Sequence, residues 1–313
     1  MVENKKIICL TPVYNDWDSF KILIQKIENI YFSDIKALNL QIIAINDGSS
    51  EDFTEFNFTK VPFSIINLKK NVGHQRAIAI GLQYINDQFT DFDYVVVLDS
   101  DGEDKPEDII SLIEKCNKLN NRKIIFAQRK KRQESLLFKT GYFIYKQVFY
   151  LLTKQKINFG NFSCIPSTLL KKVVIQENLW NHYSGSIIQS KIPFDKVLLD
   201  RGKRYAGESK MNFTNLILHG LSSISVYFDI ISVRILKFSL IGILICFLSV
   251  FTVLYFKFFT NLSVPGWASN LILIIFSIIL QLFLITLIVL LMQLSSRKNI
   301  TPPTTIIYKN FIE

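Results

Sequence analysis

Several residue types are scarce in this chain, and each shortage excludes a class of protein. Glycine and proline number only 12 and 8 among 313 residues, of which 49% are hydrophobic, so an intrinsically disordered chain is excluded. The four cysteines, Cys9, Cys116, Cys164 and Cys246, have no spacing typical of a metal site and do not indicate a disulfide-stapled secreted module. Acidic residues are outnumbered 26 to 36, and the net charge of +10 favours nucleic acid, an anionic membrane surface or a phosphorylated substrate as partner.

The N-terminus has no apolar stretch long enough for a signal peptide. Residues 1–6 are polar and the apolar run 7–10 is short, so we expect the start of the chain to stay in the cytosol. The C-terminal part differs, because residues 238–256 and 271–292 carry no charge. Each run is near the ~20 residues that cross a ~30 Å hydrocarbon core. Together with a mean hydropathy of +0.26, these runs predict two transmembrane helices.

Basic residues flank both apolar runs. Arg234 and Lys237 precede the first run, and Arg297 and Lys298 follow the second, so the positive-inside rule places both flanks in the cytoplasm. Residues 257–270 connect the runs and contain a Pro-Gly turn signal. The alternative is a pair of buried core helices. We consider it less favourable, because no other part of the chain has enough apolar surface to cover both.

The first ~230 residues alternate between strand and helix patterns, which is typical of one α/β domain. The expected strands cover residues 6–10, 41–45, 63–68, 94–98 and 123–127. The expected helices cover residues 20–30, 74–85 and 106–119. This order predicts a doubly wound, Rossmann-like sheet, in which ligands bind beyond the carboxyl ends of the strands.

Polar residues follow three of the expected strands, at 11–16, 46–50 and 99–104. The third stretch contains Asp99 and Asp101 directly after a buried strand, and two carboxylates so close do not both ionise cheaply without a cation. Oxygen ligands of this kind suit Mg²⁺ or Mn²⁺. The alternative is an acidic loop that favours the N-terminus of the following helix.

These three stretches, taken together, resemble the motifs of family-2 glycosyltransferases with the GT-A fold. They read Pro-Val-Tyr-Asn-Asp at 12–16, Asn-Asp-Gly-Ser-Ser at 46–50 and Asp-Ser-Asp at 99–101. More narrowly, the chain resembles polyprenyl-phosphate glycosyltransferases, the group that includes dolichyl-phosphate mannose synthase and has a branch with two C-terminal membrane helices. Further matches are Asn-Val-Gly-His-Gln-Arg-Ala at 71–77 and Gly-Glu-Ser-Lys at 207–210.

The resemblance implies a donor-nucleotide pocket lined by Pro12, Tyr14, Asp16, Asp47, Gly73 and Asp99. Asp47 would accept a hydrogen bond from the base. Asp16 stands where the family usually has Glu, and Asn46 stands where Asp is frequent. His74 has two interpretations, a neighbour of the helix N-cap or a contact of the donor pocket, and the sequence does not choose between them.

The resemblance also implies the catalytic and phosphate-binding residues. Asp99, Asp101 and Arg129 would be catalytic, and Asp99, Asp101 and Glu103 would hold Mg²⁺ or Mn²⁺. Donor or acceptor phosphate would be held by a set of basic and hydroxyl residues: Arg132, Lys139, Arg204, Ser209 and Lys210. Position 140, often basic in the family, is Thr140 here.

A basic and aromatic segment points to a membrane surface independently of the motifs. Residues 122–156 hold ten Lys or Arg and one acid, Glu134, with aromatic residues interleaved. This pattern predicts an amphipathic helix over 135–152 in the membrane interface, and a second apolar helix over 213–231 leads toward Arg234. The same pattern is compatible with nucleic acid, but the two membrane spans favour lipid and no nucleic-acid partner.

The expected organisation is a cytosolic GT-A domain (1–210), a juxtamembrane helix (211–235), two transmembrane helices (236–295) and a cytosolic tail (296–313). The resemblance implies an inner-membrane enzyme, open to homo-oligomerisation, that transfers a sugar with inversion from a nucleotide sugar to a polyprenyl phosphate. We expect a UDP-sugar as donor, with GDP- and dTDP-sugars as alternatives, and undecaprenyl phosphate as acceptor. The alternatives are a processive polysaccharide synthase, whose Gln-x-x-Arg-Trp motif is missing here, and a non-catalytic membrane scaffold.

Overall fold

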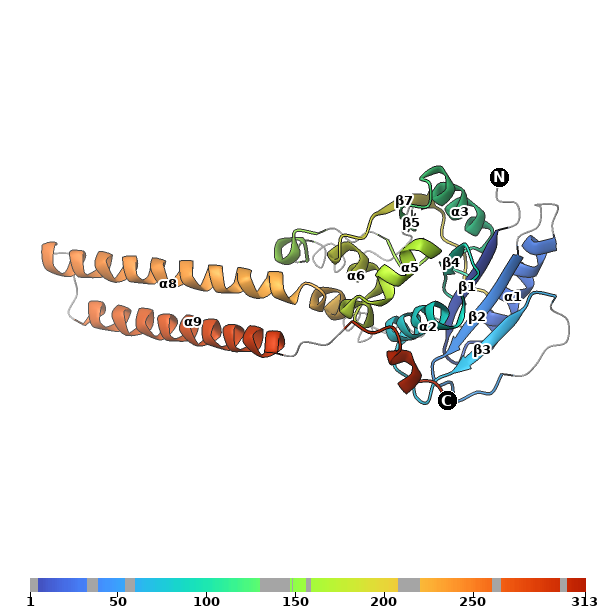
Figure 1. Cartoon of the computed structure of the whole chain (residues 1–313). Coiled ribbons are helices and arrows are strands. Elements are labelled where there is room, and N and C mark those ends of the chain that lie inside the picture. Colours follow the sequence, from blue (N-terminus) through green and yellow to red (C-terminus); the bar gives the residue numbers. More distant parts are fainter. Residues whose placement is uncertain are drawn as a thin grey trace. The chain divides into compact units, whose positions relative to one another are not determined.

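The computed structural model describes residues 5–32, 39–53, 60–129, 147, 149–155, 159–207, 220–260, 266–298 and 303–313 (Figure 1). Contacts divide the chain into two compact units. The first unit comprises Met1–Tyr145, Lys156–Val226 and Pro303–Glu313, and the second comprises Lys146–Gln155 and Tyr227–Pro302. The end of the sequence therefore belongs to the first unit, although the second unit precedes it in the chain.

The first unit is built on a mixed sheet of seven strands in the order β3-β2-β1-β4-β6-β5-β7. The strands are β1 (Lys6–Val13), β2 (Asn39–Asn46), β3 (Phe63–Asn67), β4 (Tyr94–Val97), β5 (Ile124–Arg129), β6 (Ser163–Pro166) and β7 (Phe194–Leu199). All neighbours pair in parallel except β6, which is antiparallel to both β4 and β5. The predicted α/β GT-A-like fold is confirmed, and β6 and β7 are additions that the sequence pattern did not predict.

Helices cover both faces of this sheet, which explains why its central strands read as continuous apolar runs. The helices are α1 (Trp17–Phe32), α2 (His74–Gln88), α3 (Ile109–Lys118), α5 (Ser167–Val174) and α6 (Tyr183–Gln189), with short 3₁₀ turns at Pro106–Asp108, Glu177–Trp180 and Ile307–Asn310. Along β1 the side chains alternate between two cores. Ile8 and Leu10 pack with α2, α5 and α6, whereas Ile7 and Cys9 pack with α1 and α3.

The register of the strands brings several loops to one edge of the sheet. Val13 at the end of β1 lies beside Asn46 at the end of β2, and Leu10 lies beside Val97 at the end of β4. Since β6 is antiparallel to both β4 and β5, β5 runs in the same direction as β4, and β7 is parallel to β5. The segments that follow β1, β2, β4, β5 and β7 therefore leave the sheet at the same edge.

The second unit contains two long helices, α8 (Phe228–Phe259) and α9 (Trp267–Lys298). Both are long and apolar enough to cross a membrane, and little of either is buried inside the structure. They pack antiparallel, because Gln293 near the end of α9 donates a hydrogen bond of 2.6 Å to Asp229 at the start of α8, and Gly242 lies against Leu282. The two predicted apolar helices are confirmed, and their exposure argues against the core-helix alternative.

The two predicted interfacial helices are only partly covered by the described residues. Of the helix expected over 135–152, residues 147 and 149–152 are described and are helical. Of the helix expected over 213–231, residues 220–225 are helical, but a turn at Val226 and Tyr227 separates them from α8. The boundary between the two units falls at the same turn.

Candidate active site

The loops after β1 and β2 are tied together by Asn15. Its backbone N–H donates to Ser49 Oγ at 2.9 Å, and its side-chain Oδ1 accepts from the Ser50 N–H at 2.8 Å. Asn15 has a φ of 46°, a left-handed conformation that Asn tolerates better than most residues. The Pro-Val-Tyr-Asn-Asp and Asn-Asp-Gly-Ser-Ser motifs therefore form one joined surface at the edge of the sheet.

Asp47 fixes the loop that enters α2. Its carboxylate accepts hydrogen bonds from the backbone N–H groups of Val72, at 2.7 Å, and Gly73, at 3.0 Å. The side chain is buried, and burial raises the pKa of Asp47 while these two hydrogen bonds oppose the rise. Each carboxylate oxygen keeps a second lone pair for a ligand. Asp47 thus holds the loop before α2 in place, and its remaining lone pairs can accept a hydrogen bond from a nucleotide base.

Gly48 allows two backbone segments to approach closely. It has a φ of 66°, and a Cβ at this position would lie 2.5 Å from the Asn71 nitrogen. We expect Gly48→Ala to lower the free energy of unfolding by about 1–3 kcal/mol or more, because it adds backbone strain and displaces the loop before α2. Gly160→Ala, where no atom lies within 4 Å, is the control. Thermal unfolding in detergent measures both, and equal melting temperatures would contradict this role of Gly48.

The segment after β4 gathers carboxylates. Within it, the Asp99 N–H donates to Asp104 Oδ2 at 3.0 Å, and the Glu103 N–H donates to Asp101 Oδ1 at 2.9 Å. Burial and the nearby charge of Asp99 raise the pKa of Asp101 to about 6, and the same two causes raise the pKa of Asp104. Carboxyl groups whose pKa values are raised in this way are often found at functional sites.

Guanidinium groups from the segment after β7 enter this cluster. Arg204 pairs with Asp16 and places its Nη1 3.1 Å from Asp101 Oδ2, so that one cation bridges two of the predicted site residues. Glu103 is paired with Arg201 and lies 3.5 Å from Arg129. Glu103, predicted as a metal ligand, is thus neutralised by two arginines.

His74 begins α2 and faces the acidic cluster. Its Nε2 lies 3.2 Å from Asp99 Oδ1 and 3.0 Å from the side-chain nitrogen of Asn161. Burial lowers the pKa of His74, but the charge of Asp99 and its hydrogen bond outweigh burial, and the net pKa is raised. Of the two interpretations from the sequence, this position favours a role at the site.

A divalent cation fits these residues only with help from a substrate. Within the described ranges no group of three or more His, Cys, Asp or Glu side chains has the arrangement of a metal centre. Asp99 and Asp101 nevertheless meet the usual requirement of Mg²⁺ sites, which use one or two carboxylates and take the remaining oxygens from phosphates and water. A nucleotide diphosphate would complete such a site.

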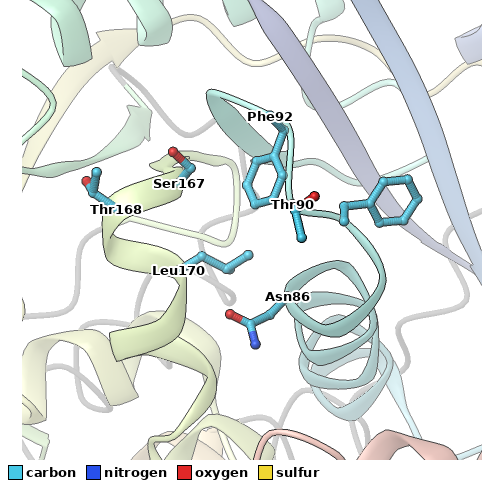
Figure 2. Close-up of a pocket in the computed structure, with 7 residues that line it drawn as sticks. Asn86, Thr90, Phe92, Ser167, Thr168 and Leu170 are labelled. Atoms are coloured by element: carbon cyan, nitrogen blue, oxygen red, sulfur yellow. The ribbon is translucent and has the colours of Figure 1, made fainter.

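Two of the cavities among the described residues lie at opposite ends of the sheet. The smaller, of about 150 Å³, is part of the edge described above; its lining residues are Asn15, Asp16, Trp17, Asp18, Glu51, Arg204, Ala206 and Gly207. The larger, of about 310 Å³, lies between the end of α2, the loop before β4 and the start of α5 (Figure 2). None of its described lining residues is charged. The charged edge is therefore the candidate active site.

The other predicted site residues divide into two groups. Pro12 is buried at the end of β1, where its carbonyl accepts a hydrogen bond from Ser100 Oγ at 3.3 Å, and Tyr14 is exposed beside it. Four lie outside the described residues: Arg132, Lys139, Ser209 and Lys210.

Three residues of the site were not singled out from the sequence: Asn15, Asp104 and Arg201. The first two lie inside polar stretches that had been recognised. Arg201 lies in the same segment as the predicted Arg204, but no pattern singled out Arg201 itself.

Comparison with known proteins identifies the family. Residues 8–178 match Glycosyl transferase family 2, and the chain belongs to this family. An uncharacterized glycosyltransferase of Bacillus subtilis is 28% identical over 88% of this chain and 85% of its own length. A prophage bactoprenol glucosyl transferase homolog of Escherichia coli is 28% identical over 71% of this chain and 73% of its own length. An undecaprenyl-phosphate 4-deoxy-4-formamido-L-arabinose transferase of Salmonella choleraesuis is 26% identical over 68% of this chain and 64% of its own length.

Solved structures share the fold at low sequence identity. Mannosyl-3-phosphoglycerate synthase from Rubrobacter xylanophilus aligns with a TM-score of 0.52 at 11% identity, over 71% of this chain and 72% of that one. Glucosyl-3-phosphoglycerate synthase from Mycobacterium tuberculosis aligns with a TM-score of 0.51 at 12% identity, over 72% of this chain and 80% of that one. These alignments establish a GT-A-like architecture for the first unit.

Proposed function

We propose that this protein transfers one sugar from a nucleotide sugar to a polyprenyl phosphate at the cytosolic face of a membrane. The observation that carries the proposal is the cluster of Asp99, Asp101 and Arg204 in a family-2 glycosyltransferase that also carries two long apolar helices. Two of the similar proteins are named for bactoprenol or undecaprenyl-phosphate transfer, which supports a lipid phosphate as acceptor.

In this proposal the joined loops after β1 and β2 hold the donor. Pro12, Tyr14 and Asp16 form one wall of the nucleotide pocket, and Asp47 and Gly73 form the other. We propose a UDP-sugar as donor. Asp99 and Asp101 would hold Mg²⁺ or Mn²⁺ against the donor diphosphate, with Glu103 as the third ligand if the ion displaces its arginine partners.

The reaction forms a bond between an acceptor phosphate oxygen and the anomeric carbon while the bond from that carbon to the nucleotide diphosphate breaks, with inversion. A phosphate monoester is already largely ionised at neutral pH, so this chain needs no strong base. Arg129 and Arg204 orient phosphate groups and offset their negative charge, which makes positioning and electrostatics the main contributions of the protein. A bound divalent cation supplies neutralisation of the leaving diphosphate.

The connectivity supports both ends of the helix pair lying on one side of the membrane. The chain leaves the first unit at Val226, enters α8, and belongs to the first unit again from Pro303 after α9. Two antiparallel spans return the chain to the side from which it left. The basic residues near these ends, Arg234, Lys237 and Arg297, favour the cytosol for that side.

Because the pKa of Asp101 is raised, we expect the affinity for a metal ion to depend on pH. Below pH 6 this carboxyl carries a proton that an entering cation must displace, because burial and Asp99 raise its pKa to about 6. Affinity for Mn²⁺ without nucleotide should therefore be constant above about pH 7 and fall up to roughly tenfold per unit below pH 6. Titration calorimetry at pH 5, 6 and 7.5 measures this dependence. Equal affinities at all three values would show that Asp101 does not bind the ion.

The experiment that tests the proposed function uses the full-length protein in detergent with undecaprenyl phosphate and Mg²⁺ or Mn²⁺. UDP-, GDP- and dTDP-sugars are supplied one at a time, and the mass of the extracted lipid is measured by mass spectrometry. We expect a lipid-linked monosaccharide from one donor, in a reaction that EDTA stops. A polymer would favour the processive synthase instead, and failure to bind every nucleotide would favour the non-catalytic scaffold.

A further inference from the structure

The C-terminal segment, residues 303–313, packs on α2 through a side chain buried in the middle of that helix. Gln83 is fully buried, and its amide is engaged mainly by this segment. Its Nε2 donates to the Thr304 carbonyl at 3.0 Å, and its Oε1 accepts from the Tyr308 N–H at 3.1 Å. A buried amide is costly to leave without partners, so this contact holds the segment in one place.

Tyr308 extends the same attachment along α2. Its ring is buried, and its hydroxyl donates to Asp87 at 2.5 Å and accepts from Gln88 at 3.0 Å. Lys309 adds an ion pair with Asp87 at 3.0 Å. The C-terminal segment is therefore anchored to the later half of α2, the helix whose first residue, His74, faces Asp99.

The last residues of the segment reach the edge strand of the sheet. Leu68, directly after β3, forms an antiparallel bridge with Ile312. The Lys69 N–H donates to the Phe311 carbonyl at 2.9 Å, and the Glu313 N–H donates to the Asn67 carbonyl at 3.1 Å. The segment thus forms an isolated antiparallel bridge at the end of β3 and pairs with the backbone of residues 67–69.

The strand residues held in this way lead directly into the candidate active site. Lys70 and Asn71 follow within two residues, and their backbone lies against Gly48. Val72 and Gly73 come next and donate to Asp47. The loop 67–73 is thereby held at its start by the C-terminal segment on one side and Asn46 of β2 on the other, and at its end by Asp47.

We propose that the C-terminal segment is a positioning element for the donor nucleotide, acting through the loop 67–73; this rests on the proposed function of that loop. Phe311, Ile312 and Glu313 do not touch the substrate. They hold the loop in the conformation that Asp47 and Gly48 require. Only residues 299–302 separate the segment from α9, so the loop is held by a part of the chain that follows both apolar helices in the sequence.

Two variants at one exposed position provide a matched test. Glu313→Pro removes the N–H that donates to Asn67, whereas Glu313→Ala keeps it. A stronger variant combines Glu313→Pro with Phe311→Ala, which also removes the ring packed 5.6 Å from the ring of Trp180.

The measurement is calorimetric affinity for UDP, GDP and dTDP, together with kcat and donor KM for whichever donor is used. We expect the double variant to bind nucleotide about tenfold more weakly and to raise donor KM to the same extent, with kcat within twofold of wild type. Glu313→Pro alone should lower nucleotide affinity about threefold, and the control Glu313→Ala should change it less than twofold. Unchanged affinity in Glu313→Pro and in the double variant would overturn the positioning role alone. Absence of nucleotide binding in the wild type would overturn the proposed function itself.

Discussion

Asp101→Asn is expected to lower kcat/KM for sugar transfer by about 10²–10³-fold without loss of stability. Asn has nearly the same shape and still accepts from the Glu103 N–H, but it removes a charge that the proposed cation site needs. Stability should be unchanged or higher near pH 7, because a pKa raised to about 6 means that ionised Asp101 is unfavourable in the folded state. Steady-state kinetics and thermal unfolding measure the two quantities separately.

The control for this substitution is Asp52→Asn, which removes a carboxylate from an exposed position after β2. It should change transfer less than twofold. If Asp101→Asn keeps a tenth or more of wild-type transfer, Asp101 is not part of the catalytic machinery. A large loss of melting temperature would instead make Asp101 a structural residue.

Arg204→Gln is expected to lower transfer by about 10²-fold and, at the same time, to strengthen Mn²⁺ binding. The guanidinium bridges Asp16 and Asp101 and competes with a metal ion for the same carboxylate oxygens. The side chains of Asp16 and Asp101 are each less than a quarter exposed. Without the guanidinium they lose its positive charge, so the affinity for a cation rises there. The reacting phosphates lose a positioning group, so turnover falls.

Arg204→Lys provides the matched comparison, since it keeps the charge but not the two-sided contact. It should bind Mn²⁺ as the wild type does and show an intermediate rate. Calorimetry of Mn²⁺ binding and steady-state kinetics on the three proteins separate these effects. Weaker Mn²⁺ binding in Arg204→Gln would contradict the competition between guanidinium and cation.

The centre of the fold was predictable because short stretches of sequence indicate its strands and the polar residues at their ends. β1, β2 and β4 are buried on both faces, so they read as continuous apolar runs, and each ends in a polar cluster. Parallel strands with such ends place Asp47, Asp99 and Asp101 at one edge, as the structure shows. The two membrane helices were predictable for a similar reason, since long uncharged runs have few alternatives.

The remaining parts depend on contacts that no local pattern reveals. β6 has only four residues, and β7 contains Asp195 and Lys196, so neither reads as a buried strand. Without β7 the position of Arg201 was unknown, and with it the neutralisation of Glu103. The docking of the C-terminal segment also escaped prediction, because it depends on the fit of Tyr308 beside Gln83 rather than on any repeating pattern.

The proposed acceptor is a phosphate-bearing lipid, and the most direct test of it compares undecaprenyl phosphate with undecaprenol under identical conditions. Both lipids are incubated with the purified protein, Mn²⁺ and the donor that it binds, and the products are analysed by mass spectrometry. We expect that undecaprenyl phosphate gains the mass of one sugar, with fragmentation that retains a sugar-phosphate bond, and that undecaprenol is unchanged. Transfer to both lipids alike, or to neither while a polymer accumulates, would contradict it.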